Sequence, residues 1–206
     1  MECEDVIKKI NEGQSDELHF IEGISSIVDV FKGISAFGNT AGGNIIIGVK
    51  PNGKVVGVNP DEVEELIFKY AESYGVPLNN FEMGRCVVGR HYVYCINVPT
   101  LKSKIGIIED SKSKQYYLRI NKQFVPASKI HRLSWKLLDS SSKKMEEDVK
   151  DQIIDLCRAK GNLSLSKLYT GIKVKNSIID YQAAELLVSG RLHLIYINEG
   201  WLIMSS

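Results

Sequence analysis

A glycine-rich segment carries the first residues that could do chemistry. Asn39, Thr40, Gly42 and Gly43 stand in the run Asn-Thr-Ala-Gly-Gly. Successive backbone N–H groups in such a turn can form a concave site for a phosphate or another anion, and the Asn39 and Thr40 side chains could add donors. The same residues also suit a structural turn, in which the glycines let the chain reverse and Asn39 ties it to a neighbouring segment. The pattern leaves both interpretations open.

A second phosphate-binding pattern starts at Gly48. Residues 48–54 match the G-x4-G-K core of a P-loop, but Val55 follows where a Ser or Thr is needed to hold magnesium. A P-loop also opens a helix, whereas Asn52-Gly53 is the strongest short-range signal for a β-hairpin. We therefore predict a hairpin with a return strand over residues 55–58, and no nucleotide site.

Basic and polar side chains near the C-terminal end are the candidates for nucleic-acid contact. They are Lys167, Lys173, Lys175, Asn176, Ser177, Gln182 and Arg191. Cations neutralise phosphates, and amides and hydroxyls reach phosphate or base edges. The same region carries Asp180 and Glu185, and residues 139–206 hold nine basic and nine acidic residues, so a protein-binding role stays open.

A second basic group surrounds a predicted hairpin in the first half of the chain. Its members are Lys102, Lys104, Lys112, Lys114, Arg119 and Lys122, with Tyr116 and Tyr117 between them. Cations interleaved with aromatic rings suit single strands or RNA. Alternation on a solvated hairpin explains the same pattern.

The cysteines and histidines show no catalytic or metal-binding spacing. Cys3, Cys86, Cys95 and Cys157 form no CxxC motif, and the four histidines flank no candidate nucleophile. A two-residue loop at Arg90-His91 would place Cys86 opposite Cys95, and we expect both to be reduced, buried residues in the cytoplasm. We predict no catalytic residue, no metal and no cofactor.

Composition sets the class of protein. The 206 residues are 44% hydrophobic and 25% charged, which is typical of a soluble globular chain with one large or two small domains. No apolar run approaches the roughly 20 residues of a membrane span, and the charged N-terminus does not resemble a secretory signal. The net charge of +1 gives no global argument for nucleic acid, so any basic patch must be local.

The elements that must position these residues fall into two groups. Up to residue 138 the pattern predicts an α+β fold, a mixed sheet with covering helices. Its expected helices cover residues 4–11, 27–38, 60–71 and 129–138, and its expected strands cover residues 16–22, 44–49, 55–58, 86–88, 92–98, 105–109 and 115–120. Asn59 and Pro60 mark one helix start, and Ser128 marks another.

The remaining residues follow a different pattern. A polar stretch, residues 139–145, predicts a linker. Residues 146–206 then read as three helices, the second starting after Ser164 and the third at Asn176 or Ser177, followed by strands over 192–197 and 201–204. Three helices followed by a hairpin is the order of a winged helix-turn-helix domain.

Residues 35–58 resemble the Schlafen AlbA-like domain, also called a divergent AAA-type or DNA-binding domain. The matching residues are Ser35, Ala36, Phe37, Asn39, Thr40, Gly42, Gly43, Ile47, Gly48, Val49, Gly53, Gly57 and Val58, with Gly38 in place of a usual alanine. The resemblance extends, by order of elements, over residues 1–138.

Some Schlafen-type domains are RNases, and the resemblance implies three carboxylates for that activity. In this chain Gln14 and His19 occupy the places of two glutamates, and Lys50 follows Gly48-Val49 where the third acid is expected. Metal-assisted cleavage needs clustered carboxylates. We therefore expect no nuclease or ATPase activity, although Glu17 and Glu22 leave a residual RNase as a third alternative.

The sequence thus favours a non-catalytic nucleic-acid-binding protein, a cytoplasmic DNA-binding transcriptional regulator. DNA is favoured over RNA, no membrane is expected, and a homodimer would match a palindromic site. The alternative is a scaffold protein whose winged helix binds protein.

Overall fold

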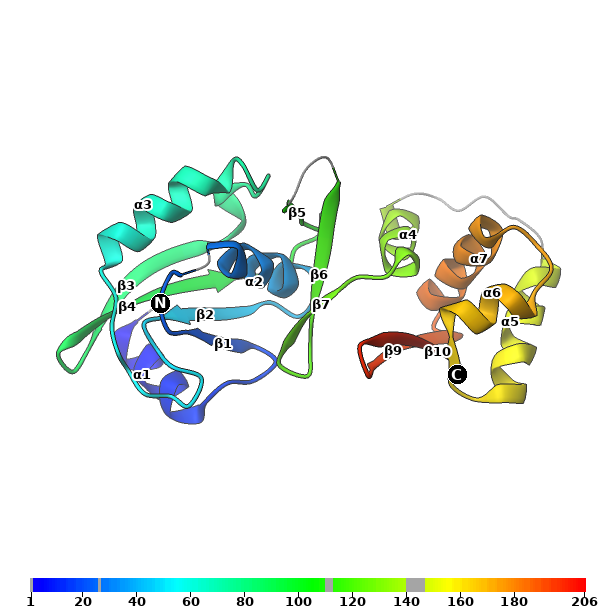
Figure 1. Ribbon diagram of the computed structural model, residues 1–206, viewed down its shortest axis with the longest axis horizontal. Helices are drawn as coiled ribbons and strands as arrows, with labels where there is room; N and C mark the ends of the chain where they lie inside the picture. Colours follow the sequence, from blue (N-terminus) through cyan, green and yellow to red (C-terminus); the bar gives the residue numbers. More distant parts are fainter. Residues whose placement is uncertain (1, 26, 110–112, 140–146) are drawn as a thin grey trace. The chain divides into compact units, whose positions relative to one another are not determined.

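A four-stranded mixed sheet forms the base of the first part of the chain (Figure 1). The computed structural model describes residues 2–25, 27–109, 113–139 and 147–206. The sheet has the order β1-β2-β4-β3, with β1 (Leu18–Ile21), β2 (Gly43–Ile47), β4 (His91–Val98) and β3 (Glu82–Val88). The β1–β2 pair is parallel and the other pairs are antiparallel. The β2 isoleucines Ile45, Ile46 and Ile47 are fully buried, as a strand covered on both faces requires.

Helices cover both faces of this sheet. α2 (Ile27–Asn39) and α3 (Pro60–Ala71) pack on one face, and α1 (Cys3–Glu12) packs on the other (Figure 1). Gly33 lets α2 approach closely, since a Cβ there would lie 2.7 Å from Cδ1 of Ile45. α3 starts as predicted: the Asn59 side chain accepts a hydrogen bond from the Asp61 N–H, and Pro60 is the first helical residue.

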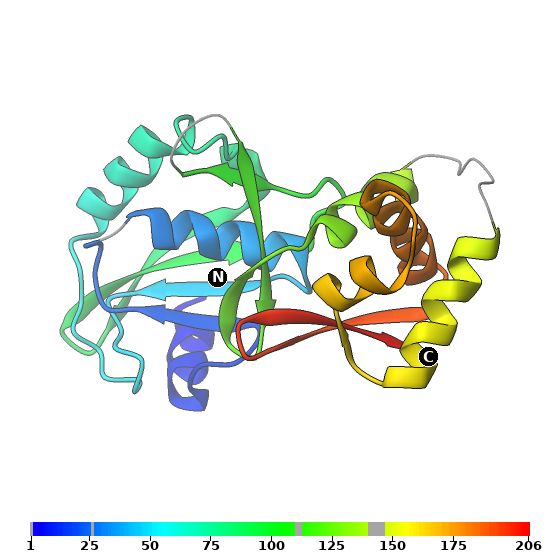
Figure 2. The same ribbon diagram turned by 45° about the vertical axis from the view of Figure 1, so that its right-hand side comes forward.

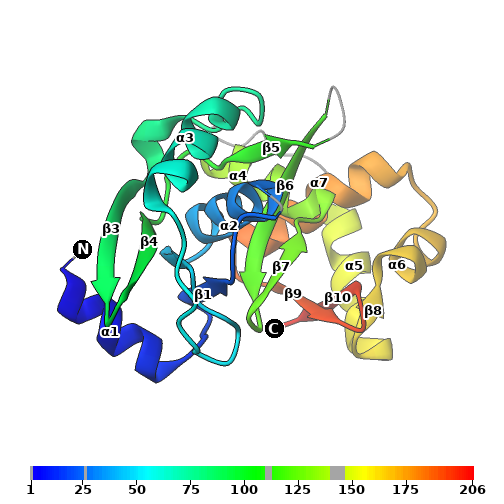
Figure 3. The ribbon, with the colours of Figure 1, turned by 60° about the vertical axis from the view of Figure 1, so that its left-hand side comes forward.

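A three-stranded sheet lies on the opposite side of α2 (Figure 3). Its order is β5-β6-β7, with β5 (Gly106–Ile108), β6 (Lys114–Ile120) and β7 (Gln123–Pro126), all antiparallel. A short 3-10 helix, Leu78–Asn80, precedes β3. α2 is therefore held between two sheets, and this explains why most of its side chains are buried.

The segment after β2 corrects one prediction. The turn at Asn52-Gly53 is present, since the Gly53 N–H donates to the Lys50 carbonyl, but no strand covers residues 55–58. One isolated bridge joins Val49 to Val55. The pairing stops there because Gly48 and Gly57 have φ values of 99° and 79°, which a β-strand does not tolerate.

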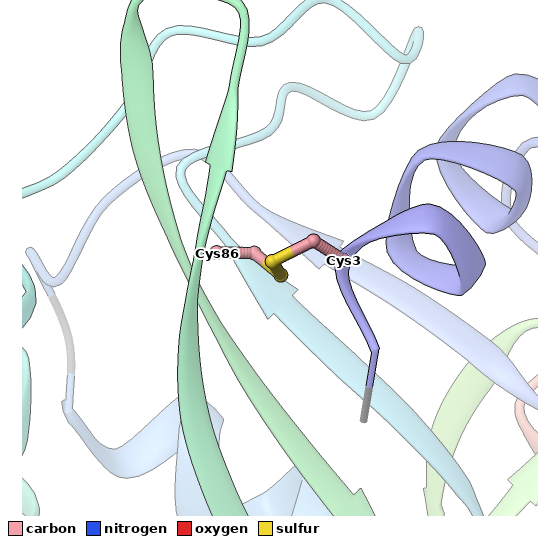
Figure 4. Close-up of a disulfide and its surroundings, with 2 residues drawn as sticks. All are labelled: Cys3 and Cys86. Atoms are coloured by element: carbon pink, nitrogen blue, oxygen red, sulfur yellow. A yellow bond between two sulfur atoms is a disulfide. The ribbon is translucent and has the colours of Figure 1, made fainter.

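The β3–β4 hairpin corrects the predicted cysteine positions. Val88 faces His91, so the loop is Gly89-Arg90 rather than Arg90-His91. Cys86 therefore faces Val93, not Cys95. Cys86 is also not a free thiol, because it forms a disulfide with Cys3 at the start of α1 (Figure 4). Cys95 is free and buried, as expected, and Cys157 is also free and buried.

The rest of the chain forms a second compact unit (Figure 2). It contains α4 (Lys129–Asp139), α5 (Glu147–Lys160), β8 (Leu163–Ser164), α6 (Leu165–Gly171), α7 (Asn176–Val188), β9 (Leu192–Ile197) and β10 (Gly200–Ser205). The sheet order is β8-β10-β9. The predicted sequence of three helices and a hairpin is present in α5, α6, α7, β9 and β10.

The predicted boundary at residue 138 is wrong. The chain divides into Met1–Pro126 and Ala127–Ser206, so α4 belongs to the second unit. The physical reason is that Ile130 is fully buried in the core built by α5, α6 and α7. Nearly all of the predicted linker, residues 139–145, lies outside the described residues.

Candidate nucleic-acid interface

Four of the predicted contact residues lie next to one another at the start of α7, and a fifth lies on the preceding helix, α6. Lys173 and Lys175 lie in the turn after α6, and Asn176 and Ser177 begin α7; Lys167 lies on α6. All five are exposed. Local sequence explains the geometry: the Ser164 hydroxyl accepts a hydrogen bond from the Lys167 N–H and starts α6, and the buried Ile172 anchors the turn. The N–H groups at the start of α7 add partial positive charge to the lysines.

The acids of α7 do not weaken this surface. Asp180 is only 1% exposed, its Oδ2 lies 2.6 Å from Nζ of Lys129, and the Tyr169 hydroxyl donates to its other oxygen. Burial and this hydrogen bond raise the pKa of Tyr169, so the hydroxyl keeps its proton. Glu185 pairs with Lys150 at 3.1 Å. Both acids are neutralised within the unit.

The corrected boundary also changes the charge balance. Residues 127–206 hold twelve basic and nine acidic residues, whereas residues 1–126 hold fourteen and sixteen. The second unit therefore has a formal charge of +3, which the predicted boundary concealed. A modest local excess of cations favours contact with phosphates.

Two predicted contact residues do not belong to this surface. Gln182 is fully buried beside Ile179 and Ala183 on the inner face of α7, so it cannot reach a base. Arg191 is exposed but follows the far end of α7, about 20 Å from Lys175 by helix rise, and its Nη2 lies 3.7 Å from Asp151. The interface is reduced to Lys167, Lys173, Lys175, Asn176 and Ser177.

The basic hairpin of the first unit is not a continuous cationic surface. Arg119 is 5% exposed and its Nη2 donates to the carbonyls of Ser15 and Leu18 at 2.8 and 3.1 Å. Its guanidinium lies 5.3 Å from the ring centre of Phe37 and 4.9 Å from that of Phe124, which indicates a structural role. Tyr117 is buried and donates to Glu109.

The other lysines of this hairpin differ from one another in exposure. Lys104 donates to the Leu101 carbonyl at 2.9 Å, and burial lowers its pKa. Lys102, Lys114 and Lys122 are exposed. Lys112 lies outside the described residues.

The glycine-rich turn has a structural explanation. The Asn39 amide donates to the carbonyls of Ile105 and Tyr117 at 2.8 and 3.0 Å, and its oxygen accepts the Ile105 N–H at 2.8 Å. Thr40 donates to the Ala36 carbonyl. A Cβ on Gly43 would lie 2.3 Å from the ring of Phe37. These contacts favour a turn that fixes α2 to β5 and β6 over a phosphate site.

Gln14, His19 and Lys50, which stand where the family resemblance implies nuclease carboxylates, make other contacts in this structure. The Gln14 side chain accepts the Phe20 N–H, and the ring of His19 lies 4.5 Å from that of Phe124. Burial, with the charge of Arg119, lowers the pKa of His19 to about 4. Lys50 pairs with Glu22 at 2.9 Å. Over the described ranges, no three His, Cys, Asp or Glu side chains gather in a way that could hold a metal ion.

Sequence reasoning missed three features with a role here. The Ser35 hydroxyl donates to the Ile105 carbonyl and accepts the Tyr117 N–H, a role that the family pattern over residues 35–58 does not show. Lys129 neutralises Asp180, and no local pattern pairs residues so far apart in sequence. Cys3 and Cys86 are separated by 83 residues, and their spacing matches no motif.

One solved structure, with a TM-score above 0.5, has a similar fold. The DIP2311 protein of Corynebacterium diphtheriae matches with a TM-score of 0.51 at 13% identity, over 98% of this chain and 51% of that one, so this chain spans about half of its length. The N-terminal domain of an ATP-dependent DNA helicase RecG-related protein from Nitrosomonas europaea matches at 0.40 and 18% identity, over 72% and 97% of the two chains. None of the curated proteins matches this chain.

Two observations remain on class and family. Among the helices in the described ranges, none combines the length and apolar character that a membrane span requires. The family model described as "Schlafen, AlbA_2" matches residues 8–128, which confirms the resemblance of residues 35–58. Because that match covers more than half of the 206 residues, the chain belongs to the Schlafen, AlbA_2 family.

Proposed function

We propose that this chain is a non-catalytic nucleic-acid-binding protein that acts as a cytoplasmic DNA-binding transcriptional regulator. The single observation that carries the proposal is the exposed group of Lys173, Lys175, Asn176 and Ser177 at the start of α7, with the exposed Lys167 on the preceding helix. In a helix-turn-helix the N-terminal residues of the second helix contact base edges. Under this proposal α5, α6 and α7 with the β9–β10 hairpin form a winged helix, and α7 is the recognition helix.

The residues of this group divide by chemistry. Lys167, Lys173 and Lys175 would neutralise phosphates and set the orientation of α7 on the duplex, without reading sequence. Asn176 and Ser177 have the donors and acceptors that recognise base edges. The side chains of Asp180 and Glu185 point into the unit's own ion pairs, so they would not repel the backbone.

The first unit would supply dimerisation, a further backbone contact or the sensing of an effector. A two-fold dimer would place two copies of α7 on the half-sites of a palindrome. This role is tested by sedimentation of the full chain with and without a palindromic duplex.

The test of binding uses the full chain and three fluorescent probes: duplex DNA, single-stranded DNA and structured RNA. We expect the tightest binding to duplex DNA, and a steep loss of affinity between about 50 and 200 mM salt, because bound lysines release counterions. No binding to any of the probes at low salt would contradict the proposal and favour the protein-binding alternative. Binding that hardly changes with salt would contradict the proposed phosphate contacts.

The proposed absence of nuclease activity is tested by a separate experiment. Transfer RNA and single-stranded DNA are incubated with the full chain and Mg²⁺ or Mn²⁺, and products are resolved on gels. We expect no cleavage, since Gln14 and His19 replace carboxylates and His19 packs on Phe124. Metal-dependent cleavage that is lost in the E17Q/E22Q double variant would overturn this part and support the residual RNase.

A further inference from the structure

A disulfide fastens the first turn of α1 to the edge strand β3 (Figure 4). It joins Cys3 to Cys86, with a Cα–Cα distance of 5.4 Å and a sequence separation of 83. Cys3 is exposed, whereas Cys86 is 3% exposed. The disulfide therefore joins a residue at the surface to one that is enclosed by the sheet.

The rest of the attachment of α1 is small. Val6 and Ile10 are its buried residues, and they belong to one apolar cluster under the sheet. The other members of this cluster are Leu18, Phe20, Ile46, Val49, Cys86, Val93 and Cys95. A helix of ten residues is marginal by itself in water, so its position depends on these two apolar contacts and on the disulfide.

We propose that the Cys3–Cys86 bond is a thiol–disulfide exchange site, and that its reduction releases α1 from the sheet. The partner is a dithiol reductant, either a small dithiol or a thioredoxin-type protein. Disulfides that open to solvent exchange with such thiols, and in reducing compartments they are transient. The inference does not depend on the proposed function.

The exchange balances without any further reagent. A thiolate of the reductant attacks Sγ of Cys3, the bond to Cys86 breaks, and the Cys86 thiolate takes up a proton. The second thiol of the reductant then displaces Cys3. The reductant leaves as a disulfide, oxidised by two electrons, and both cysteines end as thiols.

The neighbouring thiol, Cys95, does not replace the reductant. It lies opposite Gly84, diagonal to Cys86 across the hairpin, and diagonal residues are about 7–8 Å apart at their Cα atoms, too far for a relaxed disulfide. Burial also raises the pKa of Cys95 to about 11, so it keeps its proton near neutral pH. The release of α1 would uncover this thiol, which makes Cys95 a reporter of the open state.

The first test measures hydrogen exchange of the full chain with and without dithiothreitol, under native conditions. We expect exchange in α1 to rise by about tenfold or more on reduction, while α7, in the other unit, stays unchanged as an internal control. Alkylation of Cys95 should accelerate in parallel. Unchanged exchange in α1 after complete reduction, verified by intact mass, would overturn the release of the helix.

The second test asks whether the bond forms and carries the effect. The protein is isolated without reductant, in the presence of a thiol-blocking agent, and its intact mass is measured. We expect two blocked cysteines, Cys95 and Cys157, once the chain is unfolded; four would overturn the exchange site. The C3S variant changes an exposed residue, so it should fold, show fast α1 exchange and ignore the reductant. A C3S variant that responds to the reductant as the wild type does would also contradict the proposal.

Discussion

The Nζ of Lys129 lies 2.6 Å from Oδ2 of Asp180, which joins the first residue of α4 to the middle of α7. The pair is asymmetric, because the Lys129 side chain is 54% exposed and that of Asp180 is 1% exposed. The ion pair fixes α4 to the second unit. It also neutralises the buried Asp180 carboxylate, whose charge would otherwise destabilise α7. A partnered buried carboxylate is tolerated, while an unpartnered one is costly.

The first prediction concerns this pair. Lys129→Met leaves Asp180 buried with the Tyr169 hydroxyl as its remaining partner shown above, so we expect the free energy of unfolding to fall by about 2–3 kcal/mol. Urea unfolding followed by tryptophan fluorescence measures it. Lys160→Met, at an exposed lysine of α5, is the matched control and should cost about 0.5 kcal/mol or less. Equal effects of the two variants would refute the role of the pair.

The second prediction concerns pH. Burial lowers the pKa of His131 from 6.5 to about 4. Between these two pH values the unfolded chain is protonated at His131 and the folded chain is not. Its cost is absent above pH 6.5 and grows as the pH falls from 6.5 to about 4. We expect a loss of roughly 3 kcal/mol over this window from His131, and a similar one from His19.

The measurement compares urea unfolding of the wild type and of His131→Gln across that window. The variant should lose stability less steeply on acidification, because it lacks one of the two protonation sites. Parallel curves would show that His131 is protonated in the folded state, contrary to its burial beside Trp201 at a ring distance of 4.4 Å.

The third prediction concerns Arg119. Arg119→Met removes the donor to the Ser15 and Leu18 carbonyls, and this donor connects β6 to β1 and to the segment before it. We expect a loss of about 2–3 kcal/mol in the free energy of unfolding and no change in nucleic-acid affinity. Lys102→Met, at an exposed position, should change stability little. A drop in affinity without a drop in stability would restore Arg119 to a contact surface.

Gln182 provides a fourth prediction. Because its side chain is fully buried, Gln182→Ala should reduce stability by about 1–3 kcal/mol and leave the sequence preference of binding unchanged. Asn176→Ala, on the exposed side of α7, should leave stability nearly unchanged and relax the sequence preference of binding. Competition with duplexes of altered sequence separates the two outcomes. Relaxed preference in the Gln182 variant would mean that α7 presents a different face.

The sequence predicts features that depend on local chemistry. Asn59-Pro60 marks the start of α3, Ser164 marks that of α6, and the apolar run after Gly43 marks β2, because caps and short buried strands are determined within a few residues. The family pattern over residues 35–58 contributes the same kind of local information.

Features that depend on contacts distant in sequence could not be predicted. The apolar residues of α7 are spread over nearly all of its faces. The sequence pattern therefore does not show that Gln182 faces inward and Ser177 outward. The boundary was misplaced because α4 carries an ordinary amphipathic pattern that fits either unit until Ile130 is seen in the second core. The buried position of Arg119 depends on carbonyls about a hundred residues away.

The central claim is that the lysines before α7 bind the nucleic-acid backbone. The most direct measurement is the salt dependence of duplex affinity for the wild type and for K173Q/K175Q, with K8Q/K54Q, at exposed lysines of the first unit, as the matched control. We predict that K173Q/K175Q weakens binding and reduces the slope of log affinity against log salt by about 2, while the control leaves both unchanged. An unchanged affinity and slope in K173Q/K175Q, or an equal loss in the control, would contradict the account.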